Sequence, residues 1–176
     1  GRELCELRDA NALLGNWAGV KQRMDEDGYL WFRGLIDPAA VATARRTILE
    51  HLSGQNVLVP NTPILEGVMA RGSQAMNMMG RAGIAHHADV MAVVESAALY
   101  DFFSGYFGEP ATTFPYKWLR AVGNEKFTGA HYDVVYMGRG SPRLHTAWIP
   151  MGDVPVDQGA LAVCVGSHHL DGFRPL

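Results

Sequence analysis

The spacing of apolar residues predicts helices in the first part of the chain. Apolar positions recur three and four residues apart, which is the pattern of an amphipathic helix with one buried face. Glycines mark the ends of these segments, since Gly28 and Gly108 directly follow the first and the last of them. The predicted helices are Asp9–Asp27, Pro38–Gly54, with Asp37 as its cap, and Asp89–Phe107.

Two other segments interrupt this helical pattern. Residues 29–33 form a short strand-like run between the first two helices. Residues 55–88 show no sustained period and contain Pro60, Pro63 and several glycines, so we expect a long irregular excursion. Loops of that length inside a compact domain tend to be binding loops or lids.

Beyond Thr112 the pattern changes to short β-type runs separated by Gly, Pro and Asp turns. No helix long enough for a βαβ unit lies between the runs, which favours an antiparallel sheet or jelly roll over a doubly wound sheet. We therefore expect an α+β fold, with N-terminal helices packed on a β-structure. The predicted strands are Thr113–Val122, Ala130–Met137, Leu144–Met151 and Ala160–Val165.

The amino-acid composition excludes several classes of protein and several kinds of binding partner. A chain of 176 residues with 48% hydrophobic and 19% charged residues is an ordinary globular domain, and a disordered, collagen-like or coiled-coil chain is excluded. The net charge of -3 comes without a basic block, so we expect no nucleic-acid partner and no anionic membrane surface. A small-molecule substrate is the expected partner, and the oligomeric state is unknown from the sequence.

Cysteine usage and hydropathy bear on localisation. Cys5 and Cys164 are too few for a disulfide framework, and no apolar run approaches the ~20 residues that cross a bilayer. We therefore expect a cytoplasmic protein.

The sharpest candidate for chemistry is the segment that contains His131 and Asp133. In a strand, residues i and i+2 project to the same face, so the imidazole and the carboxylate would lie side by side. Such a pair is the beginning of a 2-His-1-carboxylate triad, which holds Fe(II) and leaves positions open for other ligands. The pattern also arises by chance, as a surface histidine beside an ordinary aspartate.

The sequence segments before and after His131 and Asp133 indicate a protein family. Four segments in this order resemble the phytanoyl-CoA dioxygenase family of Fe(II)/2-oxoglutarate-dependent oxygenases. The first, with its Asp-Gly-Tyr turn, matches the opening of the family, and the last contains a Gly-Ser-His turn. The segments are Asp25–Pro38, Ala130–Arg139, Thr146–Asp153 and Gln158–His168.

The resemblance implies a fold, an activity and a metal site. The implied fold is a double-stranded β-helix, or jelly roll, covered by the N-terminal helices. The implied enzyme is a dioxygenase that hydroxylates a small molecule and uses Fe(II), O2 and 2-oxoglutarate, which is decarboxylated to succinate. By the same resemblance, His131 and Asp133 are the catalytic residues and the first two iron ligands.

Three further residues are candidates for binding 2-oxoglutarate. Trp148 matches a tryptophan that lines the co-substrate site in the family, although a core aromatic would look the same. Lys117 can neutralise a co-substrate carboxylate, but a solvated lysine at a strand edge is equally compatible. Thr146 is two positions before Trp148 and would share its strand face.

The chain also departs from the family. The distal histidine ligand and the arginine that clamps 2-oxoglutarate lie several dozen residues after the Gly-Ser-His turn in the family, whereas this chain ends eight residues after His168. We therefore expect residues 1–176 to be a single, C-terminally incomplete domain of this family with an open, two-ligand site. Two alternatives remain: a non-catalytic binding module with the same fold, and a cupin-like metal enzyme in which His168 is the third ligand.

Overall fold

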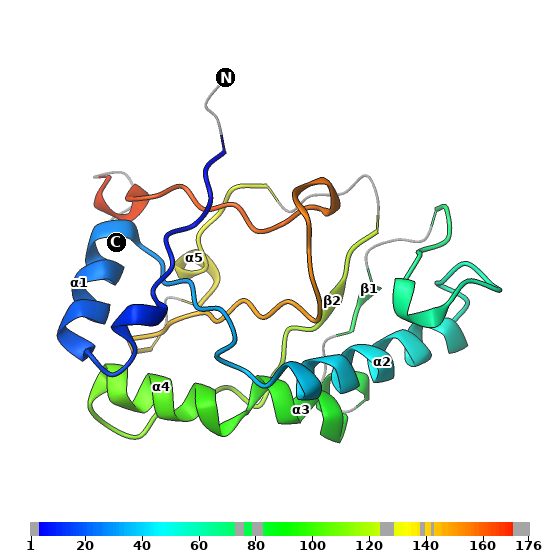
Figure 1. Ribbon diagram of the computed structural model, residues 1–176, viewed down its shortest axis with the longest axis horizontal. Helices are drawn as coiled ribbons and strands as arrows, with labels where there is room; N and C mark the ends of the chain where they lie inside the picture. The colour runs from blue at the N-terminus through cyan, green and yellow to red at the C-terminus, as the bar shows by residue number, and fades with distance from the viewer. Residues whose placement is uncertain are drawn as a thin grey trace.

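The computed structural model describes residues 4–72, 76–78, 83–123, 129–137, 140–141 and 143–170. Helices α2, α3 and α4 lie along one side of the molecule and α1 stands at one end of it, while the segments after α4 run over the opposite side (Figure 1). The helices are α1 (Trp17–Asp27), α2 (Pro38–Gly54), α3 (Ala88–Val94), α4 (Ala97–Phe107) and α5 (Val134–Met137), and the strands are β1 (Met76–Asn77) and β2 (Arg120–Ala121).

Helix α1 begins later than the apolar pattern predicts. A 3-10 turn over Asn11–Leu13 comes first, and the side chain of Asn16 then caps α1 by accepting a hydrogen bond from the Gly19 backbone N–H. The predicted end is confirmed, because Gly28 takes the left-handed conformation (φ 79°) and its N–H bonds to Met24.

Helix α2 has the predicted bounds. Asp37 accepts a hydrogen bond from the backbone N–H of Ala39 at 3.0 Å, and Pro38 occupies the first turn, where its missing N–H costs nothing. The predicted strand over residues 29–33 is reduced to one isolated bridge between Asp9 and Trp31.

The third predicted helix is in fact two. Its backbone breaks at Ser96, whose extended conformation (φ -62°, ψ 148°) starts α4 after α3 has ended at Val94. The break lets each piece pack on a different partner: α3 contacts α2, and α4 contacts α1. The left-handed Gly108 (φ 74°) ends α4 as predicted.

Two apolar clusters hold these helices. The first joins α2 and α3 to the segments that follow them, and its buried members are Ile48, Leu49, Leu52, Val57, Leu58, Met78, Ala85, Val90 and Leu119. The second is aromatic and lies between α1 and α4, where Phe102 contacts the rings of Trp17 and Phe32 edge to face. Together, these two clusters pack the helical side of the molecule.

The predicted jelly roll is not formed by the described residues. Their only ladder is the antiparallel pair of β1 and β2, with Met76 opposite Ala121. The predicted strands Leu144–Met151 and Ala160–Val165 are irregular, and Ala130–Met137 contains α5 instead. A β-type run becomes a strand only where a neighbouring strand satisfies its backbone, and these runs have no such neighbour in the part of the chain that is described.

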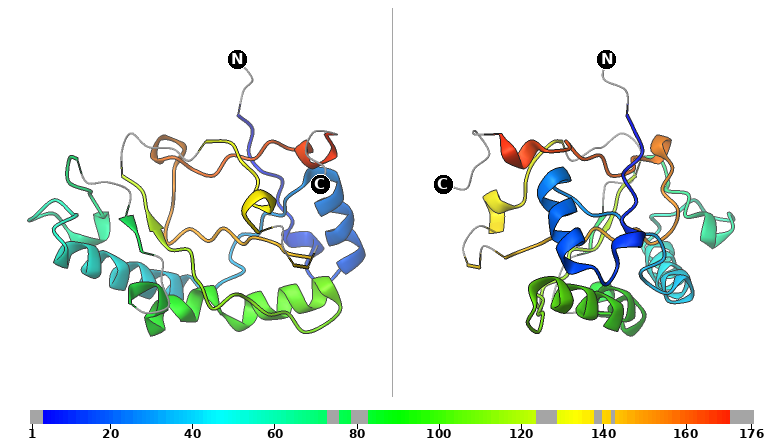
Figure 2. Two further views of the ribbon diagram at one scale, coloured as in Figure 1. Left: turned by 180° about the vertical axis from the view of Figure 1, so that it is seen from behind. Right: turned by 60° about the vertical axis from the view of Figure 1, so that its left-hand side comes forward.

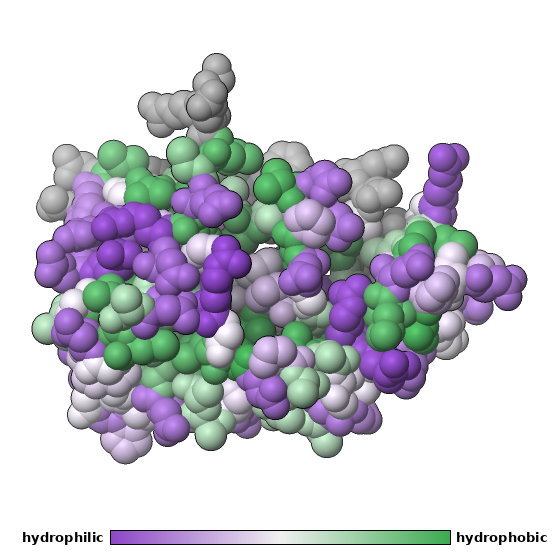
Figure 3. Space-filling model, viewed as in Figure 1, coloured by the Kyte–Doolittle hydropathy of each residue, from purple (hydrophilic) through white to green (hydrophobic). Residues whose placement is uncertain are grey.

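The surface is hydrophilic at one end of the molecule (Figure 3) and carries exposed apolar side chains on the irregular segments. Hydrophilic residues gather over the end of the molecule formed by α1 (Figure 3). The segments after β2 are mostly irregular, as the two views in Figure 2 show. Several large apolar side chains on these segments are exposed. Among the described residues, no helix has the length and apolar character needed to cross a membrane.

Candidate functional site

The two residues of the predicted metal pair lie in a turn rather than on a strand. Residues 129–132 are irregular, and Asp133 opens α5, with its carbonyl accepting hydrogen bonds from the N–H groups of Tyr136 and Met137. The predicted strand is therefore wrong for this segment, and strand alternation does not bring the two residues together. The side chains nevertheless meet, because His131 Nε2 lies 3.6 Å from Asp133 Oδ1.

Neighbouring groups orient both side chains. His131 Nδ1 lies 3.0 Å from the carbonyl oxygen of Gly129. A carbonyl only accepts, so Nδ1 carries the proton and the lone pair of the neutral ring is on Nε2, which faces Asp133. On the other side, Thr146 Oγ1 donates a 2.6 Å hydrogen bond to Asp133 Oδ2 and leaves Oδ1 toward the histidine.

This arrangement fits a divalent metal ion as a partial ligand set. Two ligand atoms that are each about 2.1 Å from a common ion lie about 3.0–3.4 Å apart. His131 Nε2 and Asp133 Oδ1 are 3.6 Å apart, so they would have to approach each other by a few tenths of an ångström to bind one ion. The side chains of His131 and Asp133 are 42% and 40% exposed, so the site is open to an ion from solvent. A hydrogen-bonded outer shell of the kind seen around metal ligands is already present in Gly129 and Thr146.

A third ligand is not supplied by the described part of the chain. The one group of three His, Cys, Asp or Glu side chains found there with mutually close ligand atoms consists of Asp25, His168 and His169. His168 therefore does not share a centre with His131 and Asp133. The cupin-like arrangement, which needs it to do so, is not what this structure has.

Lys117 is buried, and its partner belongs to the chain itself. Its Nζ lies 2.6 Å from Glu95 Oε1, at the end of α3, and donates a 2.5 Å hydrogen bond to the carbonyl of Phe114. The anion that a buried lysine requires is thus a glutamate in this structure. Binding of 2-oxoglutarate by Lys117 would have to displace this ion pair.

Trp148 lies on the same irregular segment as Thr146. It is 51% exposed, so it is not part of the hydrophobic core. Trp148 is two residues after Thr146, the threonine that contacts Asp133. The two residues were expected to share one face of a strand, but this segment is irregular in the structure.

His168 and His169 lie in a cluster with Asp25 that the sequence pattern did not predict. Both lie in a 3-10 turn over Ser167–His169, and both Nε2 atoms lie within hydrogen-bonding distance of the backbone oxygen of Asp25 at the end of α1. Adjacent histidines after a Gly-Ser turn are the only local signal. The partner lies 143 positions away from His168, so no pattern in the sequence could have indicated it.

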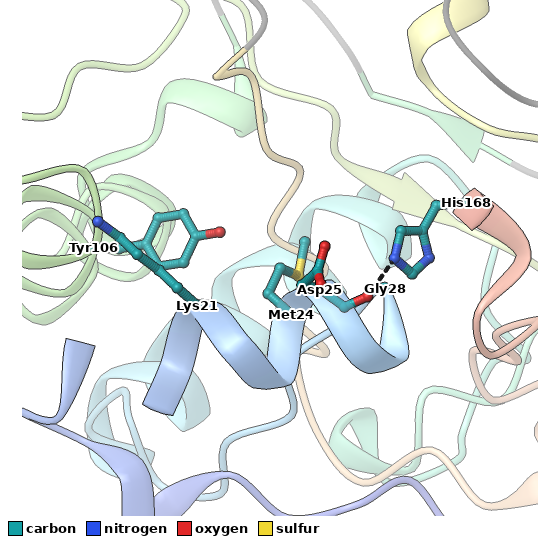
Figure 4. Close-up of a pocket in the computed structure, with 6 residues that line it drawn as sticks. All are labelled: Lys21, Met24, Asp25, Gly28, Tyr106 and His168. Atoms are coloured by element: carbon teal, nitrogen blue, oxygen red, sulfur yellow. Dashed lines mark hydrogen bonds between the residues drawn. The ribbon is translucent and has the colours of Figure 1, made fainter. Parts of the chain in front are cut away.

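Tyr106 borders the same region of the molecule. Together with Lys21, Met24, Asp25, Gly28 and His168, it lines a cavity of about 390 Å³ (Figure 4). Burial raises the pKa of the Tyr106 hydroxyl above its ordinary value of 10.0. The phenol is therefore neutral at neutral pH.

Comparison with known proteins indicates a family for the chain. The model of the family described as Phytanoyl-CoA dioxygenase (PhyH) matches residues 24–175. The 1-deoxypentalenic acid 11-beta-hydroxylase of Streptomyces arenae is 26% identical over 175 residues, which cover 93% of this chain and 58% of the relative. The enzyme of the same name from Streptomyces exfoliatus is 26% identical over 172 residues, covering 94% of this chain and 59% of the relative.

The chain thus spans a little under three fifths of the length of the curated relatives that it matches. No solved structure matches it significantly.

Proposed function

The chain belongs to the phytanoyl-CoA dioxygenase family, and from this premise we propose that the protein is an Fe(II)- and 2-oxoglutarate-dependent dioxygenase that hydroxylates a small organic molecule. The observation that carries the proposal is the pair formed by His131 Nε2 and Asp133 Oδ1, 3.6 Å apart and oriented by Gly129 and Thr146. The names of the two Streptomyces relatives, both hydroxylases of an organic acid, support this class of substrate.

In this proposal, His131 and Asp133 hold the iron. When bound, iron and 2-oxoglutarate supply the oxidising chemistry, in which O2 is consumed, 2-oxoglutarate gives succinate and CO2, and the substrate gains a hydroxyl group. The protein contributes position and protonation state. Gly129 keeps the imidazole proton on Nδ1, so that Nε2 is free to bind metal, and Thr146 keeps one carboxylate oxygen of Asp133 occupied.

The proposal includes a jelly roll in the active protein. Large apolar side chains along the two irregular runs support it, since Leu144, Trp148, Leu161 and Val165 are between 38% and 61% exposed. Exposing apolar side chains to water costs free energy, and such a surface is typical of one that another part of a protein covers. Pairing of the runs with further β-structure would cover it and would also satisfy their backbone groups.

Co-substrate turnover tests the function without knowledge of the substrate. We expect the full-length gene product, supplied with Fe(II) and O2, to release CO2 from carboxyl-labelled 2-oxoglutarate and to form an equal amount of succinate. Asp133→Ala removes the anionic ligand and should abolish both products, as should His131→Ala. His87→Ala is a matched control, because this half-exposed histidine contacts Asp89 in α3 and not the proposed iron ligands.

The same experiment separates the enzyme from a non-catalytic binding module. A module of the same fold would retain 2-oxoglutarate or metal without forming succinate. Unchanged turnover in Asp133→Ala, or loss of iron binding in His87→Ala, would show that the metal site has been misplaced.

A further inference from the structure

The end of α1 and the Gly-Ser-His turn meet in a second cluster of metal-ligating groups. The imidazoles of His168 and His169 lie with their centroids 4.0 Å apart. Their Nε2 atoms converge on one point, the backbone oxygen of Asp25, at 2.7 and 2.6 Å. One ligand atom from each of these three residues lies within 4.8 Å of the other two, the carboxylate of Asp25 serving as the third donor.

The two segments are held together independently of any ion. The N–H of Gly166 donates a 3.0 Å hydrogen bond to the carbonyl of Asp27, so the backbone of the turn is docked on the end of α1. The ring of His168 rests against Gly28, where an added Cβ would come 2.5 Å from its Nδ1 (Figure 4). Because Nδ1 faces Gly28, Nε2 is the nitrogen that His168 presents to a ligand.

Electrostatics at this end of α1 favours a cation. Asp25, Glu26 and Asp27 stand together at the helix C-terminus, where the helix dipole is already negative. Arg8 pairs with Glu26 and Asp27, and Arg23 also pairs with Asp27. No described residue forms an ion pair with the carboxylate of Asp25, which is the acid beside the two histidines.

There is also room for the remaining ligands of an ion. The cavity of about 390 Å³ opens beside Asp25 and His168, and Lys21 and Tyr106 border its other end (Figure 4). Lys21 Nζ lies over the Tyr106 ring, 5.8 Å from its centroid, away from the histidine pair. Water in this cavity would complete a four-coordinate ion.

We propose that Asp25, His168 and His169 form a binding site for a divalent transition-metal ion such as Zn²⁺, separate from the site of His131 and Asp133, which ties the end of α1 to the Ser167–His169 turn. Two imidazoles, one carboxylate and water are a ligand set suited to Zn²⁺. On binding, each neutral imidazole moves its proton from Nε2 to Nδ1, and the metal replaces the two hydrogen bonds to the Asp25 carbonyl.

Zinc titration of the metal-free protein tests this site. The titration uses the His131→Ala/Asp133→Ala variant, so that the first site does not contribute, and isothermal calorimetry measures stoichiometry and affinity. We expect one equivalent of Zn²⁺ to bind. In the same background, Asp25→Asn and His169→Ala should each weaken binding roughly tenfold or more, since loss of even an outer-shell partner commonly costs that much.

Matched controls distinguish coordination from general attraction. Asp25→Asn keeps the backbone carbonyl that both histidines contact, so its fold should be unchanged by circular dichroism. Glu26→Gln removes a charge at the same helix end, and Cys164→Ser removes a thiol four positions before His168 in the sequence, but both should bind Zn²⁺ like the parent. The proposal is overturned if Asp25→Asn binds as tightly as the parent, or if Glu26→Gln or Cys164→Ser weakens binding as much as His169→Ala does.

Thermal unfolding gives a second, independent readout. A ligand that binds only the folded state raises the melting temperature. Saturating Zn²⁺ should therefore raise it in the parent and much less in Asp25→Asn. An equal rise in both would contradict a site built on Asp25.

Discussion

The hydroxyl of Thr146 and the carboxylate of Asp133 are joined by a 2.6 Å hydrogen bond that spans 13 positions of the chain. The bond occupies Oδ2 and leaves Oδ1 on the side of His131, whose Nε2 is 3.6 Å away. Thr146 therefore acts as a positioning residue for the proposed iron ligand. A role in binding 2-oxoglutarate directly would require its hydroxyl to leave Asp133.

Thr146→Val tests this positioning role. Valine has nearly the same shape but no hydroxyl, so Asp133 loses its orienting bond while the packing is kept. We expect Fe(II) affinity to fall roughly tenfold or more, the usual cost of removing an outer-shell partner. Thr146→Ser, which restores the hydroxyl, should restore the affinity. Equal iron binding in the valine and serine variants would contradict the role.

Trp148→Ala tests the proposed wall of the co-substrate site. If Trp148 lines the 2-oxoglutarate site, its loss should raise the KM for 2-oxoglutarate more than it weakens iron binding. Trp118→Ala is a matched control, because Trp118 is exposed to the same extent, 51%, and contacts Tyr116. An unchanged 2-oxoglutarate dependence in Trp148→Ala, or an equal change in Trp118→Ala, would remove Trp148 from the site.

Lys117→Met separates a structural lysine from a co-substrate lysine. Lys117 is only 7% exposed and its ammonium pairs with Glu95, so the substitution leaves a partly buried carboxylate without this partner. We expect a loss of stability of about 1–3 kcal/mol, measured by urea unfolding. The double variant Lys117→Met/Glu95→Gln should recover part of that loss. A Lys117→Met protein of normal stability that needs far more 2-oxoglutarate would instead indicate a co-substrate ligand.

Gly105→Ala tests the packing of α1 on α4. A Cβ at Gly105 would overlap the indole of Trp17, which packs on Phe102 at 5.9 Å between ring centroids. We expect a loss of about 1–3 kcal/mol, the usual cost of overpacking a core. Gly54→Ala, in the last turn of α2, is the matched control because no atom lies within 4 Å of the added Cβ. It should be neutral or slightly stabilising, and similar losses in both variants would contradict the explanation.

The iron affinity of the chain itself is the last prediction. Two protein donors bind a metal ion more weakly than three, and the described residues bring no third donor to His131 and Asp133. With the second proposed site removed by Asp25→Asn, residues 1–176 should therefore bind Fe(II) weakly compared with a family enzyme that has a complete triad. Competition with a calibrated iron chelator measures this. Tight, stoichiometric binding that depends on Asp133 would indicate a third ligand outside the described residues.

Local chemistry in the sequence determined the helix ends and the candidate pair. Asp37 and Pro38 start α2, and Gly28 and Gly108 end α1 and α4, because caps and left-handed glycines act within a few residues of themselves. The family resemblance, now supported by a match over residues 24–175, rests likewise on short segments in a fixed order. His131 and Asp133 come together although the strand predicted for them is absent, since residues two apart are close in many backbone conformations.

Only the tertiary structure decided which distant groups meet. It paired Lys117 with Glu95, aimed Thr146 at Asp133, and joined Asp25 to His168 across 143 positions. It also left Leu144–Met151 and Ala160–Val165 without ladder partners, so their β-type composition produced no sheet among the described residues. A strand and a long-range contact both depend on what the rest of the chain brings beside them, and the free energy of that closure is not encoded in any short stretch of residues.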